Sequence, residues 1–148
     1  MARWTMDIAQ YARKKQVEIK DVRKAYTFAL YSSIVKKTPV DTGRARANWN
    51  IAVGNPDSSV SDGTMKSGMK YRSFGEVPGS DGDEPVYISN NLPYIETLEY
   101  GGYPNPPKGG EGKTENGFSK QAPEGMVGVT IANSEAIFNA ALKAVRGK

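Results

Sequence analysis

The twelve residues Thr38–Trp49, TPVDTGRARANW, decide how this chain of 148 residues folds. Thr38 and Pro39 end the helix that precedes them, because a residue before proline avoids the helical region and proline lacks a backbone N–H. Gly43 supplies the positive φ that a tight turn often requires. An alternation of apolar side chains begins at Trp49 and predicts a strand. The stretch is therefore expected to join a helix to a strand through a sharp corner.

Residues 6–37, upstream of this corner, are predicted to form one long amphipathic helix. Apolar residues recur there at spacings of three, four and seven, and no Gly or Pro interrupts residues 1–37. Lys36 and Lys37 suit the negative end of the helix dipole. About thirty helical residues would span about 45 Å, which is more than a small domain needs. The helix is expected either to lie across its own sheet or to pack partly on a neighbouring copy.

Downstream of the corner, residues 54–85 are rich in Gly, Ser, Asp and Pro, and are expected to be mobile, ordered by a partner or extended as an arm. A short strand is predicted at Val86–Ser89. A second distinctive stretch follows, Asn91–Gly101, NLPYIETLEYG. Its apolar residues have helical spacing and Pro93 suits a first turn, so one or two helical turns are expected. The side chains expected to point inward are Leu92, Ile95 and Leu98.

The last third of the chain adds a second loop, a strand and a helix. Residues 102–120 are expected to form an extended loop, and Met126–Ile131 alternates in a way that predicts the clearest strand of the chain. Glu135–Val145 is predicted to be the C-terminal helix. Its expected apolar set is Ala136, Ile137, Ala140, Ala141, Ala144 and Val145. Together these elements predict one α+β domain over residues 1–148, in which a long N-terminal helix and a C-terminal helix pack on a small, mainly antiparallel sheet with long mobile loops.

Composition argues against most catalytic chemistry. The chain has no cysteine and no histidine, so thiolate chemistry, disulfides and the commonest general base and metal ligand are all excluded. It has no Gly-rich phosphate loop, no zinc-ligand set and no nucleophile elbow. We therefore expect no enzyme activity, no catalytic or metal site and no cofactor. The N-terminus has no signal-like apolar segment and no run is long enough to span a membrane, so an intracellular protein is expected.

The triplet Asp41-Thr42-Gly43 has one enzymatic interpretation. A dimeric aspartic protease presents one such triplet in each subunit, and the two carboxylates share a proton. That triplet belongs in an apolar β context, whereas a polar helix precedes this one and Arg-Ala-Arg follows it. A capped turn between helix and strand is the preferred interpretation.

Charge is divided unevenly along the chain. Residues 1–50 contain eleven Lys and Arg against four Asp and Glu, whereas residues 51–148 contain nine against twelve. The division predicts a basic face and an acidic face, suited to nucleic acid or to head-to-tail contact between copies. Acidic side chains at residues 73–107 would repel DNA that must pass without sticking. Glu96 or Glu99 is the candidate partner of Arg44 or Arg46, in a bidentate pair that would join the two distinctive stretches.

Three blocks in order resemble the neck or tail-completion proteins of long-tailed bacteriophages, a family often described as a tail component. TPVDTGRARANW matches the first block, NLPYIETLEYGGYP the second, and QAPEGMVGVT a third that in the family is a Gln/Pro-led strand before a C-terminal helix. Ala45 stands where leucine is common, and Ile95 where alanine is common. The residues that carry the resemblance and mark the expected assembly site are Pro39, Asp41, Thr42, Gly43, Arg44, Arg46, Trp49, Tyr94, Glu99, Tyr100 and Gly101.

The resemblance implies a non-enzymatic virion protein, made in the host cytoplasm and located in the neck or tail. Proteins of this kind form rings, expected to be hexameric, that finish the tail or join it to the filled head. The implied partners are further copies, the tail terminator, the tail tube and the head-closure proteins, with DNA passing through the lumen without sequence-specific binding and with no membrane involved. The alternative is a small DNA-binding protein that uses the basic residues of the first helix.

Overall fold

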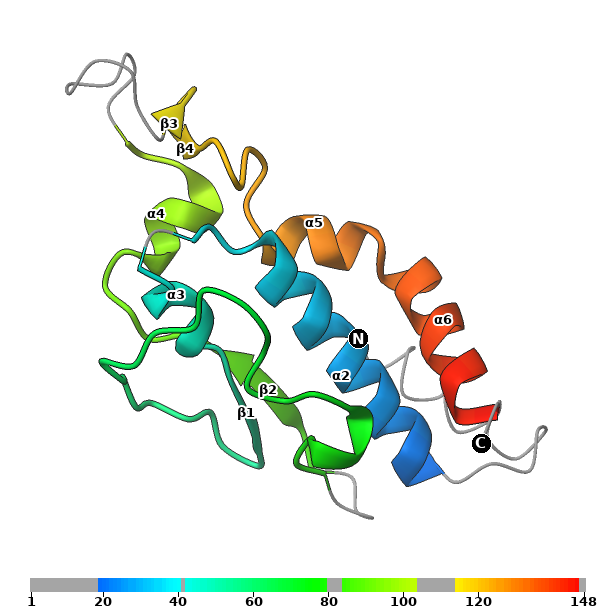
Figure 1. Ribbon diagram of the computed structural model, residues 1–148. Helices are drawn as coiled ribbons and strands as arrows, with labels where there is room; N and C mark the ends of the chain where they lie inside the picture. Colours follow the sequence, from blue (N-terminus) through cyan, green and yellow to red (C-terminus); the bar gives the residue numbers. More distant parts are fainter. Residues whose placement is uncertain (1–18, 41, 80–83, 104–113, 147–148) are drawn as a thin grey trace.

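The computed structural model describes residues 19–40, 42–79, 84–103 and 114–146 (Figure 1). Within them, helices are combined with two small antiparallel strand pairs, which confirms the α+β class. The elements in order are α2 (Ile19–Lys37), α3 (Arg44–Ala47), β1 (Asn50–Val53), the 3-10 turn η1 (Phe74–Glu76), β2 (Val86–Ser89), α4 (Ile95–Tyr100), β3 (Thr114–Glu115), β4 (Phe118–Ser119), α5 (Val127–Ala132) and α6 (Ser134–Arg146).

Helix α2 is the central element of the fold, with α6 along one side and the β1–β2 pair on the other (Figure 1). The predicted long helix is confirmed over Ile19–Lys37, and its earlier part lies outside the described residues. It ends where proline predicted, because the Thr38 backbone N–H bonds to the Val35 carbonyl and the Thr38 hydroxyl donates to the Ile34 carbonyl at 2.7 Å. The helix stop is therefore made by a buried threonine as well as by proline.

The strands predicted at Trp49–Val53 and Val86–Ser89 are confirmed as an antiparallel pair. Their register joins Asn50 to Ser89 and Val53 to Val86. Part of the connecting segment packs against the core, since Val77 is buried and Tyr71 lies edge-on to Tyr31, with ring centroids 5.1 Å apart. That part is not an extended arm. The predicted loop at 102–120 likewise contains structure, the short β3–β4 hairpin.

Two hydrophobic clusters share helix α2. The larger one gathers side chains from α2, β1, α4 and the segment before α5, among them Tyr31, Val35, Trp49, Leu92, Leu98 and Met126. The smaller one joins α2 to α6 through Val22, Ala25, Phe138, Ala141, Leu142 and Val145. The C-terminal helix, expected on the sheet, therefore makes its main contacts with α2. Phe138 and Leu142 are buried where sequence reasoning had placed Ile137 and Ala140, because the apolar face is turned by about one residue.

The strand predicted at Met126–Ile131 is wrong. Val127–Ala132 is helix α5, and the Thr130 hydroxyl donates to the Met126 carbonyl four residues earlier, at 2.7 Å. The alternation covers only six residues, a run so short that its surroundings can override the pattern and choose the conformation. Here the surroundings are helix α2, which α5 contacts through the Ser33 and Thr130 hydroxyls at 3.0 Å, and a carboxylate at the start of α5.

Candidate functional site

The corner after α2 depends on Gly43. Its φ is 89°, and a Cβ at this position would lie 2.7 Å from backbone atoms of Met65 and Lys66. The Met65 backbone N–H donates to the Gly43 carbonyl at 2.9 Å, so the 61–66 segment crosses directly over the corner. Thr42 accepts a bond from the Arg44 N–H at 3.2 Å, as a turn residue should. Thr42 and Gly43 lead into helix α3 and not directly into a strand. Asp41 lies outside the described residues.

The expected pairing of the corner arginines with Glu96 or Glu99 is wrong. Arg46 donates to the carbonyls of Thr38 and Lys36, at 3.0 and 3.3 Å, and so caps the C-terminal end of α2. Arg44 donates to the Ser61 carbonyl and reaches Asp62 at 3.3 Å, in an exposed ion pair. Both guanidinium groups therefore hold neighbouring loops in place.

Trp49 is buried beneath the corner, with 4% of its surface exposed. Its indole Nε1–H donates to the Thr38 hydroxyl at 2.9 Å. That hydroxyl in turn donates to the Ile34 carbonyl, so one chain of hydrogen bonds connects β1 to the last turn of α2. The indole thus contributes both apolar area and a satisfied polar group to the core.

Glu99 caps helix α5. Its carboxylate accepts the backbone N–H groups of Met126, Val127 and Gly128, at 2.9, 2.7 and 2.9 Å. These are the first donors of α5, which have no partner inside a helix, and a negative charge there also suits the helix dipole. Gly125 is required beside it, with a φ of 82° and no room for a Cβ against the Glu99 backbone carbonyl. The second block of the sequence is joined to the third in this way.

Gln121 joins the third block to the first. Its side-chain amide bonds to both backbone groups of Val40: the Val40 N–H donates to Oε1 at 2.7 Å, and Nε2 donates to the Val40 carbonyl at 2.9 Å. The amide thus satisfies the same two groups that a neighbouring strand would satisfy. The sequence placed Gln121 at the start of the third block but gave it no hydrogen-bond partner.

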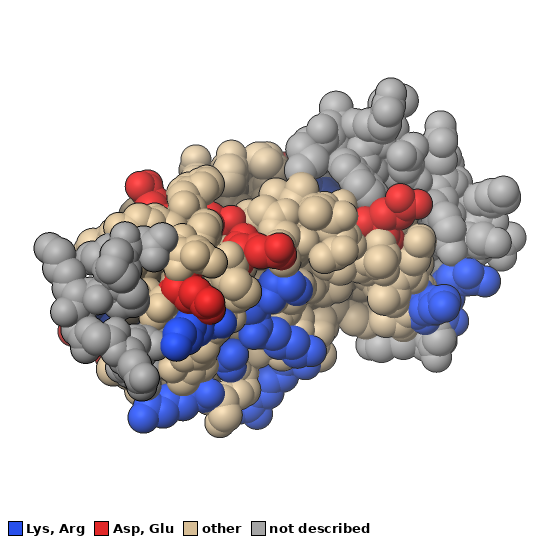
Figure 2. Space-filling model, turned by 90° about the horizontal axis from the view of Figure 1, so that it is seen from above, with Lys and Arg blue, Asp and Glu red and all other residues tan. Residues whose placement is uncertain are grey.

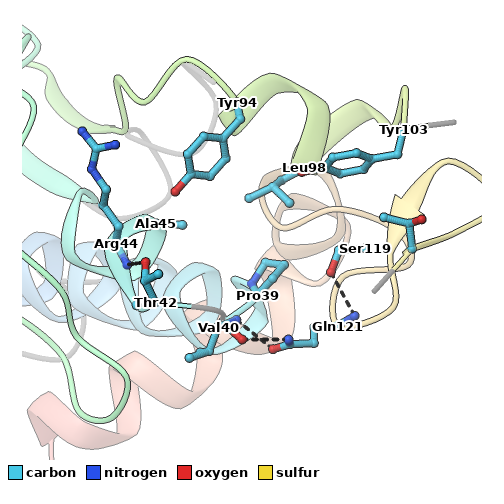
Figure 3. Close-up of a pocket in the computed structure, with 12 residues that line it drawn as sticks. Pro39, Val40, Thr42, Arg44, Ala45, Tyr94, Leu98, Tyr103, Ser119 and Gln121 are labelled. Carbon is cyan, nitrogen blue, oxygen red and sulfur yellow. Dashed lines mark hydrogen bonds between the residues drawn. The ribbon is translucent and has the colours of Figure 1, made fainter. Parts of the chain in front are cut away.

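The three blocks surround one pocket with a volume of about 520 Å³ (Figure 3). Pro39, Val40 and Ala45 line it from the corner, and Tyr94, Leu98 and Tyr103 from the α4 region. Asn90 strengthens this contact by donating to the Ala45 carbonyl at 2.9 Å. Burial raises the pKa of Tyr103, and the nearby Tyr94 adds to the shift. The corner and the α4 segment therefore do fold together, through apolar contacts and an amide and not through the expected charge pair.

Two of the expected site residues keep solvent-exposed surface. Tyr100 is 79% exposed and Tyr94 is 37% exposed, at opposite ends of α4. Gly101 ends α4 with a φ of 82°, where a Cβ would lie 3.1 Å from the ring of Phe118 in β4. The glycine therefore lets the hairpin approach, while the tyrosines remain available for contact.

The charged surface is mixed on the face shown in Figure 2, where a group of Lys and Arg side chains lies next to several carboxylates. In α2, Arg23 donates to the Glu84 carbonyl at 2.7 Å and Lys24 to the Gly75 carbonyl at 3.3 Å. These two cations hold the β1–β2 connection against the helix. The cluster at residues 13–15, on which the DNA-binding alternative also depends, lies outside the described residues.

No group of three metal-ligating acidic side chains occurs within residues 19–40, 42–79, 84–103 and 114–146. In the same ranges, none of the helices combines the length and the apolar character needed to cross a bilayer. Comparison of the chain with protein-family models, with curated proteins and with solved structures found no significant match. The geometry of the site holds three separated segments together and leaves aromatic side chains exposed, which suits binding to another protein.

Proposed function

We propose that the protein is a structural component of the head–tail junction of a long-tailed bacteriophage, where its copies form a ring that finishes the tail or joins it to the head. The three sequence blocks that resemble neck and tail-completion proteins provide the starting point. In this proposal the ring is hexameric and lies in the virion after synthesis in the host cytoplasm. Its neighbours are the tail terminator, the tail tube or the head-closure proteins, and DNA passes through its lumen without sequence-specific binding.

One observation carries the proposal. The residues of the three blocks meet around a single pocket, held by the Gln121 amide on Val40 and by the Glu99 carboxylate on α5. The described residues that carry the resemblance fall into two groups, those that hold this arrangement and the tyrosines that it leaves exposed. A rigid corner with exposed aromatics is a suitable surface for another protein.

Particle assembly provides the test. Lysates of the phage with this gene deleted should contain heads and tails that are unjoined or unfinished, and adding the purified chain should restore complete particles. Tyr94→Ser should reduce this restoration, because Tyr94 lines the pocket. Tyr87→Ser is the matched control, since Tyr87 has nearly the same exposure, 36% against 37%, but lies on β2 outside the pocket. Normal particles from the deletion strain would refute the proposal.

The DNA-binding alternative receives less support, because Arg23 and Lys24 are engaged with backbone carbonyls and Lys37 donates to Ser33 at 2.8 Å. Binding of short duplex DNA by the purified chain at several salt concentrations separates the two proposals. Tight binding with a steep salt dependence would favour the alternative, since each neutralised phosphate releases counterions.

A further inference from the structure

A groove of about 590 Å³ runs between α2 and α6, away from the pocket described above. Apolar side chains from both helices form much of its lining, including Phe28, Ala29, Ile137 and Ala140. Its cations are Lys36, Lys37 and Arg72. Lys37 bonds to a serine, whereas Lys36 and Arg72 form no ion pair within the described residues. The groove therefore offers an apolar floor and positive charge that no described carboxylate pairs with.

A complementary surface lies where α4 meets the start of α5, and we call its members, Glu96, Tyr100 and Val127, which line one shallow pocket, the α4–α5 surface. Glu96 and Tyr100 are four residues apart in α4 and so lie on one face of the helix. Tyr100 is 79% exposed and Val127 is half-buried. Glu96 forms no ion pair within the described residues, and the sequence has no Lys or Arg from residue 73 to 107. This surface combines exposed apolar groups with a negative charge.

We propose that the α4–α5 surface of one copy docks in the α2–α6 groove of the next copy. Tyr100 would cover the apolar floor, and Glu96 would lie near Lys36 and Arg72. The inference rests on the proposed ring function and names the surfaces that the ring would use. Contact between two different surfaces of identical chains is head-to-tail, and it produces a closed ring when the rotation between neighbours closes.

Charge complementarity selects a second copy as the occupant of the groove. The two surfaces carry opposite charges, and each has apolar groups that the other could cover. They belong to separate elements of one chain, so a single molecule can present both at once, as Figure 1 shows for α4 and α6. A symmetric dimer that joins groove to groove would instead bring like charges together, which is unfavourable.

Disulfide cross-linking tests this contact directly, because the chain contains no cysteine of its own. A chain carrying both Tyr100→Cys and Ala140→Cys should form a ladder of covalent multimers under mild oxidation, in concentrated protein or in assembled particles. Each single-cysteine variant should form no covalent multimer. A mixture of the two single-cysteine variants should form covalent dimers and nothing larger. A chain carrying Tyr100→Cys and Val60→Cys is the matched control, since Val60 is 48% exposed but lies outside the groove, and it should give no ladder.

Charge reversal provides the second arm of the test. Lys36→Glu combined with Arg72→Glu should lower the yield of the ladder by about tenfold or more, since like charges then face one another. Adding Glu96→Lys to that chain should restore much of the yield. Failure of the double-cysteine chain to form a ladder, both in concentrated protein and in particles that contain it, would overturn the inference and leave the proposed function standing. A ladder from the Val60 control, or one unaffected by charge reversal, would also overturn it. Exclusion of the wild-type chain from particles would instead overturn the proposed function.

Discussion

Removal of the Glu99 carboxylate should destabilise the protein by about 2–4 kcal/mol. Glu99→Ala leaves three backbone N–H groups at the start of α5 without their acceptor. Loss of a helix cap costs about 0.5–2 kcal/mol, and a hydrogen bond to a charged group contributes about 1.5–3 kcal/mol. The Gly128 bond is exposed and water can replace it, so we count the bonds of Met126 and Val127 as the larger part.

Urea unfolding, followed by circular dichroism, measures this loss of stability. In thermal unfolding of a chain of this length, each kcal/mol lost lowers Tm by about 2–4 °C. Glu96→Ala is the matched control, because Glu96 lies on the same short helix and accepts none of these bonds; it should change stability by less than about 0.5 kcal/mol. Glu99→Gln keeps an acceptor but loses the charge, so its loss of stability should lie between those of Glu96→Ala and Glu99→Ala. A loss below about 1 kcal/mol for Glu99→Ala would refute the assignment of Glu99 as the residue that holds α5 helical.

Three further changes test the corner and the core. Trp49→Ala should cost about 3–5 kcal/mol in the same unfolding assay, because a buried indole is removed, and a loss below about 1 kcal/mol would show that Trp49 lies at the surface. Gly43→Ala should destabilise by more than about 1 kcal/mol, because its positive φ and the backbone of Met65 both exclude a Cβ; an unchanged urea midpoint would mean that the corner can relax. Burial raises the pKa of Tyr31 above 10.0, so as pH rises the Tyr31 hydroxyl ionises in the unfolded chain before it ionises in the folded one. The free energy of unfolding should therefore fall as pH rises above 10, and Tyr31→Phe should weaken this fall. An equal fall in the wild-type and Tyr31→Phe proteins would contradict this role of Tyr31.

The sequence located helices and strands correctly where a single local feature, such as a proline or an apolar alternation, was clear. Pro39 and the alternation from Trp49 correctly marked the end of α2 and the start of β1. The spacing of Leu92 and Leu98 correctly marked two buried side chains, one just before α4 and one within it. These predictions depend on features of residues close together in the chain. Proline has no backbone N–H and a fixed φ, and apolar side chains on one face recur every second residue in a strand and every third or fourth residue in a helix. The sequence by itself therefore determined the α+β class and the meeting point of its first helix and strand.

Only the tertiary structure decided which partners the polar side chains take. Glu99 was expected to bind an arginine, but it caps α5, and Gln121 was given no hydrogen-bond partner although it bonds to both backbone groups of Val40. The Glu99 carboxylate also explains why the segment predicted as a strand at Met126–Ile131 forms a helix instead. Glu99 lies 27 residues before Met126 and accepts the first backbone N–H groups of that helix. For groups far apart in the chain, a side chain's hydrogen-bond partner depends on which groups folding brings within about 3 Å, and sequence spacing does not give that distance.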